Sequence, residues 1–294
     1  ERPKLDPRHL PNEFAQVASG CHFYHGNLSP LNNSLDTGDN VTSDTKTIFR
    51  YLNEHWFSWS VDVDAVNSPI ANDPWQRVYF TGDGLPKVTN NAIFNGANMP
   101  AVSYRLGVQA PEIVILGVVT DAATTEVDPN DDEDRYYTHT YVTEQGEEGP
   151  PGEASLKMEI KYPLEEGTFV TLGFSAPNVN QSNITHRRIY RTSTGGGVAD
   201  YLLVAEIPIA QADFVDDVES SALGTSLETY DYEMPPEDMF GLVSMANGIM
   251  AGFTGNTVCF SKAYLPYAWP TDYQMTTEHQ IVARIALGNS VAVL

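Results

Sequence analysis

The clearest structural signal in the chain lies in residues 242–260, which read LVSMANGIMAGFTGNTVCF. Asn247-Gly248 and Gly255-Asn256 interrupt this apolar stretch, and both dipeptides accept positive φ and favour tight hairpin turns. The stretch is therefore predicted to be an antiparallel β-meander. Its three predicted strands are Leu242–Met245, Ile249–Phe253 and Thr257–Phe260.

The hairpin pattern returns 33 residues later, where Gly288-Asn289-Ser290-Val291 matches Gly255-Asn256-Thr257-Val258. The second copy lies between predicted strands at residues 281–286 and 290–294. A meander that recurs at such an interval is typical of β-propeller blades, although roughly 40 residues per blade is more usual. The sequence predicts part of a β-propeller body, and an ordinary antiparallel sandwich is the alternative.

Further strands are predicted towards the N-terminus, after a single helix. Asn12 can cap that helix, which extends to Gly20. Residues 113–119 are apolar at every position, which favours a strand buried on both faces. The other strands predicted in this part of the chain are Ile48–Tyr51, Trp56–Val63 and Val78–Thr81.

Negative charge is concentrated in the middle of the chain. Residues 112–238 hold 6 basic and 26 acidic side chains, a net charge of −20, whereas residues 1–111 carry −3 and residues 239–294 carry none. Such a change in composition indicates an inserted domain, and one acidic face of a single domain is the alternative. The predicted strands of the insert are Tyr136–Thr143, Phe169–Phe174, Arg188–Thr192, Tyr201–Ile207 and Phe214–Val218.

The fold class expected from these patterns is mainly β. The partial propeller body comprises residues 1–111, with the N-terminal helix, and residues 239–294, where the chain looks truncated because it stops inside a strand-like run. Residues 112–238 are predicted to form an acidic β-sandwich inserted between them.

Composition excludes several classes of function. The 294 residues are 41% hydrophobic and carry a net charge of −23, so the chain should fold but gains nothing from releasing counterions on a nucleic acid. No apolar run approaches the length of a membrane span. The two cysteines, Cys21 and Cys259, cannot form a disulfide framework.

The candidate metal and phosphate motifs are incomplete. Cys21, His22 and His25 have the spacing of half a zinc site, but a tetrahedral site needs four ligands. Asp128, Asn130, Asp132 and Asp134 alternate as in a calcium loop, but the glycine and glutamate of that loop are missing. Gly195-Gly196-Gly197 precedes a strand rather than a helix, which excludes a phosphate loop. We therefore expect no metal and no cofactor.

No catalytic constellation is recognisable either. Asp62 and Asp64 share one face of the aromatic run and are expected to point to solvent, whereas a catalytic carboxylate pair needs one member in an apolar pocket. Trp269 lies between Pro266 and Pro270, and either plugs the sheet edge as a buried ring or forms an aromatic platform for a sugar. The buried ring is favoured, and no catalytic residue is assigned.

Several segments in a consistent order resemble the tail nozzle family (tail tubular protein B, or tail hub) of short-tailed double-stranded DNA bacteriophages. They span almost the whole chain, and one of them, RIYRT at 188–192, resembles a fibronectin type III strand. The remaining segments are LDPRHLP at 5–11, FAQVA at 14–18, GNLSPL at 26–31, VYFTGDGLPKVT at 78–89, YRLGV at 104–108, YVTEQGEEGP at 141–150, NGIMAG at 247–252, FS at 260–261 and PYAWP at 266–270.

The resemblance implies a structural virion protein without enzymatic activity. It implies a homohexameric ring below the portal and adaptor proteins, which lines the DNA exit channel, supports tail fibres or spikes and serves genome ejection. It also implies a fibronectin type III-like fold for the insert. The expected location is the virion tail, after synthesis in the host cytoplasm. One departure is length, because members of the family are usually much longer.

The same sequence patterns leave two other functions open. A carbohydrate-binding or carbohydrate-cleaving propeller with an accessory sandwich predicts a cleft that joins paired acids with Trp56, Trp59 or Trp269. A secreted adhesin predicts more than one fibronectin-like unit, and the sequence contains one.

Overall fold

The structure is a computed structural model, and its contacts divide the chain into two compact units, residues 1–41 and 42–294. In the first unit, the strands β1 (Cys21–His22) and β2 (Ser29–Pro30) form an antiparallel pair. The predicted helix before Gly20 lies outside the described residues. The structure describes residues 21–22, 29–30, 41–53, 55–96, 100, 102–121, 133–161, 167–192 and 200–294.

The second unit is mainly β, as the sequence predicts, and its sheets are antiparallel. Its described residues contain no α-helix, only the short 3₁₀ helices η4 (Ser220–Ala222) and η5 (Thr271–Tyr273). None of the helices in the described part of the chain has the length and apolar character that crossing a membrane requires.

Residues 42–111 form a hairpin followed by a four-stranded meander. In the hairpin, Tyr51 at the end of one strand is paired with His55 at the start of the next. In the meander, each strand is paired with its successor in the chain. The strands are β3 (Thr47–Tyr51), β4 (His55–Trp59), β5 (Asp64–Asn67), β6 (Val78–Thr81), β7 (Lys87–Thr89) and β8 (Tyr104–Arg105).

Residues 239–294 contain the predicted meander, extended by a fourth strand that the sequence analysis did not predict, and the predicted hairpin. Gly255 and Gly288 have φ of +56° and +62°, and each is the first residue of a two-residue turn, where type II′ geometry favours glycine. The strands are β17 (Phe240–Ser244), β18 (Met250–Thr254), β19 (Thr257–Phe260), β20 (Gln274–Thr276), β21 (Arg284–Leu287) and β22 (Ser290–Val293).

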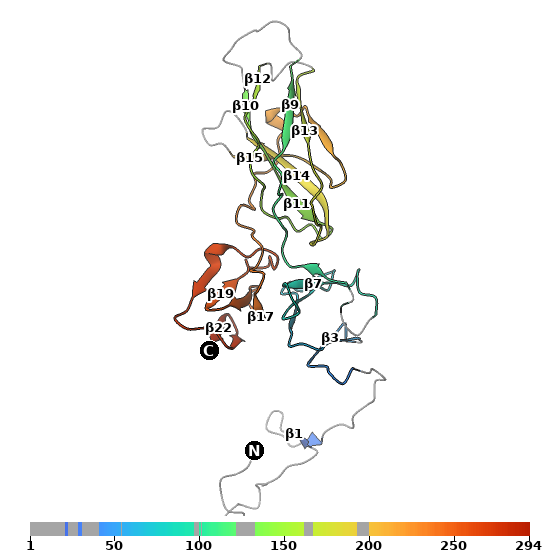
Figure 1. Ribbon diagram of the computed structural model, residues 1–294, viewed down its shortest axis with the longest axis vertical. Helices are drawn as coiled ribbons and strands as arrows, with labels where there is room; N and C mark the ends of the chain where they lie inside the picture. The colour runs from blue at the N-terminus through green and yellow to red at the C-terminus, as the bar shows by residue number, and fades with distance from the viewer. Residues whose placement is uncertain are drawn as a thin grey trace, which may run out of the picture. The chain divides into compact units, whose positions relative to one another are not determined.

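The central segment, residues 112–238, contains three sheets of its own with the strand orders β16-β13-β9, β11-β14-β15 and β10-β12. Figure 1 shows the long strands β11, β14 and β15 running side by side. The strands are β9 (Leu116–Thr120), β10 (Glu133–Arg135), β11 (Tyr137–Thr143), β12 (Met158–Ile160), β13 (Phe169–Gly173), β14 (Ile184–Thr192), β15 (Tyr201–Pro208) and β16 (Asp213–Asp216).

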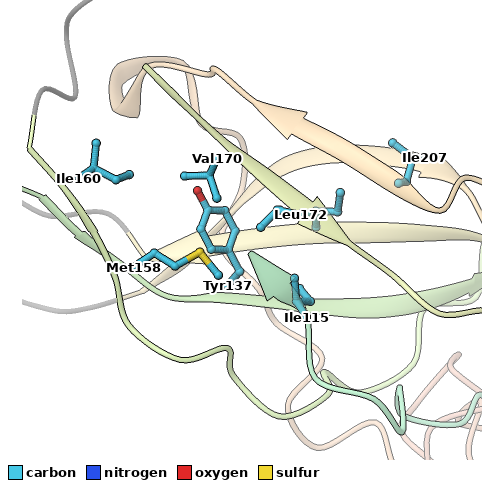
Figure 2. Packing of buried hydrophobic residues seen from close by; sticks show 8 residues of the cluster. Ile115, Tyr137, Met158, Ile160, Val170, Leu172 and Ile207 are labelled. Carbon is cyan, nitrogen blue, oxygen red and sulfur yellow. The ribbon is translucent and has the colours of Figure 1, made fainter. Parts of the chain in front are cut away.

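Side chains from these three sheets share one core. Figure 2 shows the Tyr137 ring in the middle of this cluster, with Met158, Val170 and Leu172 around it. Val170 and Leu172 are fully buried at alternate positions of β13, as the period-two pattern predicts. The Tyr137 hydroxyl donates a hydrogen bond of 2.6 Å to Asp216, so a polar contact also joins two of the sheets inside the core.

A second core joins the two flanks of the central segment. Tyr79 and Leu106 come from residues 42–111, and they pack in one cluster with Met239, Leu242, Met250, Cys259 and Trp269 from residues 239–294. The amide of Leu242 also donates a 3.3 Å hydrogen bond to the Thr81 hydroxyl. The flanks therefore pack on each other although the whole central segment separates them in the chain.

Two strand predictions are wrong in detail. Residues 113–119 are not buried on both faces, because only one face of β9 meets the core, and Leu116 and Val118 on the other face are 75% and 67% exposed. The aromatic run from Trp56 to Val63 is not one strand, because β4 ends at Trp59. The Thr47 hydroxyl donates to the Val61 carbonyl and accepts from the Val63 amide, which fixes the bend before β5.

Trp269 offers a direct test of the flank core, because its ring is 1% exposed and its Nε1 donates a 2.9 Å hydrogen bond to the Pro266 carbonyl. We expect Trp269→Ala to lower the free energy of unfolding by about 3–5 kcal/mol through loss of buried contacts. Tyr273→Ala is the control, since Tyr273 is 45% exposed, and should cost about 0.5 kcal/mol or less. Urea denaturation measures both, and equal effects would contradict the packing.

Candidate functional site

The central segment meets its flanks at a junction made of apolar, backbone and ionic contacts. Its apolar part is a cluster of Val108, Tyr141 and Ile184, with Ile209 and Tyr267 packed against it. Val108 comes from the first flank, Tyr267 from the second, and the other three from the central segment. One apolar cluster therefore contacts all three parts of the chain.

Close backbone contacts at the junction require glycine. Gly107 has φ of +90°, and an added Cβ would lie 3.1 Å from the Cα of Met234. A Cβ on Gly149 would lie 2.8 Å from the side chain of Val108. The Gly149 carbonyl accepts a 2.8 Å hydrogen bond from the Thr229 hydroxyl. Gly149 thus lies close both to Val108, just before the central segment, and to Thr229, near the end of that segment.

A buried arginine forms the ionic part of the junction. Arg77 Nε donates to Asp73 at 2.7 Å, and Arg77 Nη1 donates to Glu147 of the central segment. Burial raises the pKa of the Glu147 carboxyl, and Arg77 opposes that shift. Burial also acts to raise the pKa of Asp73, but the hydrogen bonds and charge of Arg77 outweigh it and lower that pKa. Removing Arg77 would leave two carboxylates without a cation, which is costly in a buried position.

A second arginine makes a more exposed contact of the same kind. The Arg105 amide donates a 2.8 Å hydrogen bond to the Gln181 carbonyl, and its Nη2 lies 2.9 Å from Glu237. The Glu237 side chain is 70% exposed, so this ion pair contributes little to stability on its own. The two contacts join β8 to the loop before β14 and to the C-terminal end of the central segment.

Beside the junction lies a polar hollow of about 390 Å³. Glu148 is buried in its wall and accepts hydrogen bonds from Thr140 at 2.6 Å, Tyr190 at 2.7 Å and Arg188 at 2.5 Å. Both oxygens of this carboxylate therefore accept hydrogen bonds from neighbouring side chains, which fixes its orientation in the wall. The hollow is lined by Gly146, Glu148, Arg188, Tyr190, Leu203, Thr225, Ser226, Glu228, Thr229, Tyr232 and Tyr267.

Another hollow, of about 270 Å³, lies where the first strands of four successive flank sheets meet. Arg284 on β21 reaches across it, pairs with Asp64 on β5 at 2.6 Å and donates a 3.2 Å hydrogen bond to the Leu242 carbonyl on β17. The first strand of the β3–β4 hairpin supplies the remaining wall. One guanidinium thus links three sheets around a common centre.

The tryptophans considered for sugar binding occupy different environments. Trp59 and Trp269 are buried in separate cores, which confirms the prediction of a buried ring for Trp269. Trp56 is half-buried on β4, with the Arg50 guanidinium 5.9 Å from its ring centroid. The structure therefore brings none of these three rings together with another into a shared platform.

The acidic and metal-ligating candidates are also dispersed. Asp62 is exposed, as expected, but Asp64 is not a free carboxylate because it pairs with Arg284. Cys259 is buried, and burial raises the pKa of its thiol to about 11. Asp134 contacts Lys157 at 3.1 Å. His25, Asp128, Asn130, Asp132 and residues 195–197 lie outside the described residues, and within the described part no three His, Cys, Asp or Glu are grouped as a metal site.

The sequence pattern did not predict a set of buried ionic groups on β14. Arg187 and Arg191 are fully buried on the core side of this strand, where an alternating pattern predicts apolar residues. Arg191 pairs with the buried Asp216 at 2.5 Å. Arg187 has no carboxylate partner among the described residues, and its guanidinium lies 4.6 Å from the Phe174 ring centroid and donates to the Ser175 carbonyl. The only signal in the sequence is that Arg187 and Arg191, four residues apart, fall on the same face of the strand as Ile189.

No protein-family model matches the chain, and no curated protein is significantly similar to it. The junction residues are engaged with one another, and they form a connection that fixes the central segment to both flanks. Apolar and ionic contacts at the junction thus join the central segment to the flanks.

His139 permits a test of the buried groups by pH. Burial, together with the nearby charge of Arg187, lowers the pKa of His139 to about 3. The unfolded chain binds this proton at the ordinary value of 6.5, so stability is present above pH 6.5 and is lost as the pH falls towards 3, by up to ~1.4 kcal/mol per pH unit. We expect His139→Phe, which keeps the ring contacts with Tyr141 and Phe174, to abolish this part of the loss.

The measurement is urea denaturation of wild type and variants at several pH values between 7 and 4. The exposed His279 provides the control, because His279→Phe should retain the wild-type dependence on pH. Parallel pH profiles for wild type and His139→Phe would show that the His139 ring is protonated normally in the folded protein.

Proposed function

We propose that this chain is a structural subunit of the tail nozzle of a short-tailed double-stranded DNA bacteriophage. It assembles as a homohexameric ring below the portal and adaptor proteins, forms the DNA exit channel in the virion tail and supports tail fibres or spikes during genome ejection. The ordered segments that resemble this family, from LDPRHLP at 5–11 to PYAWP at 266–270, support the proposal, as does an architecture suited to mechanical coupling rather than to catalysis.

Within this proposal the two flanks form part of a β-propeller. The observation that carries this assignment is the hollow that contains Arg284 of β21. It is lined by β3, β5, β17 and β21, which are the first strands of four successive sheets. First strands of propeller blades face the central axis in this manner. The hairpin turns that follow the first strands of the last two sheets lie at Gly248 and Gly288, and this interval of 40 residues fits one blade.

The 33-residue interval between the two similar tetrapeptides does not measure the length of a blade. Gly255 lies between the second and third strands of its sheet, whereas Gly288 lies between the first and second described strands of the next. The two tetrapeptides therefore share a turn type but not a position in the repeat. The interval between Gly248 and Gly288 is the one that compares equivalent hairpins.

The central segment is proposed to be a fibronectin type III-like β-sandwich inserted between two blades. The sheets β16-β13-β9 and β11-β14-β15 contribute to one core and are joined by Tyr137, Arg191 and Asp216. Both ends of the segment meet at the junction near Gly107 and Gly149, as an insertion in a loop requires.

The charge of the chain fits passage of DNA without binding. A net charge of −23 repels phosphates, which keeps a genome mobile in a channel. The alternative, a carbohydrate-binding or carbohydrate-cleaving propeller, depended on Trp56, Trp59 or Trp269 beside paired acids. Burial of two of these rings removes their use as sugar platforms.

Cryo-electron microscopy of particles that contain the full protein tests the proposal. We expect six copies arranged as a ring around an axial channel at the tail. A single copy per particle, or a location away from the tail, would contradict it. A glycan bound among acids in an isolated monomer would instead favour the carbohydrate-binding alternative.

A further inference from the structure

One face of the β16-β13-β9 sheet is turned away from the core. Side chains of these strands alternate between the core and this second face, which we name the outer face. In the register of the sheet, Val118, Thr171 and Val215 lie in one row across it, and Leu116, Gly173 and Asp213 lie in the next. Thr120 and Phe169 form the third row.

The outer face is apolar in a highly charged segment. Leu116, Val118 and Val215 are 75%, 67% and 46% exposed, and Phe169 is half-buried. Asp213 is the only charged residue among the eight positions that the three strands give this face. Four of the eight positions therefore carry apolar side chains on one exposed face, and such a group of exposed apolar side chains is typical of interaction sites.

The arginines of the central segment do little to offset its surface charge. Arg135, Arg187 and Arg191 are 5%, 0% and 0% exposed, and Arg188 is engaged by both Glu148 and Glu206. These four are all the arginines among residues 112–238, which also hold 26 acidic side chains. The apolar outer face is therefore carried by a segment whose outward charge is strongly negative.

We propose that the outer face is a docking surface for a partner protein segment that places apolar side chains on Val118 and Val215 and lysine or arginine side chains around them. The apolar contacts supply the affinity. The negative field of the segment attracts a basic partner and repels an acidic one. This inference does not depend on the proposed function. It names the surface and the chemistry of its partner in any assembly that contains the chain.

Charge decides between this partner and a second copy of the same surface. Two copies of the outer face in contact would bring together two segments that each carry a net charge of −20. Each copy would also bring Asp213 into or next to the contact, where its charge would lose water without gaining a cation from the other outer face. A basic partner has the opposite effect, because it offers a cation to Asp213 and lowers the repulsion within the segment.

The test measures binding of short fluorescent peptides to the chain by anisotropy, at low and high salt. The probes are a peptide in which leucine alternates with lysine, one in which leucine alternates with glutamate, and one in which threonine alternates with lysine. The double variant Val118→Thr, Val215→Thr keeps β-branched side chains in the strands but removes apolar surface. Val179→Thr is the matched control, because Val179 is 57% exposed outside the sheet.

We expect the leucine–lysine peptide alone to bind, with affinity that falls at high salt. The double variant should weaken this binding about fivefold or more, and Val179→Thr should not change it. Equal binding of the threonine–lysine peptide, no binding of the leucine–lysine peptide, or no effect of the double variant would overturn the proposal. Self-association of the wild type that the double variant abolishes would assign the surface to a second copy and would also overturn it.

Discussion

The constraint on which the structure depends is the core that the two flanks share. Tyr79 and Leu106 can be buried only if Leu242, Met250 and Trp269 return to them after the whole central segment. This fixes where residues 112–238 must begin and end, because both ends have to lie beside the same core. The junction around Val108 and Gly149 and the Arg77–Glu147 contact follow from that requirement.

Local patterns in the sequence predict much of the β-structure because their causes are local. Gly255 and Gly288 specify turns through positive φ, which glycine adopts without a steric penalty, and the strands on either side follow from them. Alternation along β13 predicts which of its side chains are buried. The net charge of the chain changes at the two ends of the central segment, and the strands between these ends form sheets of their own. The domain boundaries themselves stay a prediction.

Other features could not be predicted because they depend on residues that are distant in the chain. Arg187 and Arg191 can face the core because Phe174, directly after β13, and Asp216 on β16 contact them there. The end of β4 at Trp59 depends on the Thr47 hydroxyl of another strand. The ion pairs Asp64–Arg284 and Arg77–Glu147 likewise join segments far apart in sequence, so the local charge pattern around Asp64 predicts an exposed carboxylate where the structure has an ion pair.

Thermal and urea unfolding of a chain in which a flexible Gly/Ser linker replaces residues 112–238 tests whether the flanks share one core. If the flanks form one body, the shortened chain, which keeps all four tryptophans, will unfold in a single cooperative transition, with the tryptophan fluorescence changing in the same step. Replacing residues 112–238 removes Glu147, so the transition should come at a lower denaturant concentration than in the full chain. A shortened chain without cooperative unfolding and with solvent-exposed tryptophans would show that the flanks do not form one body.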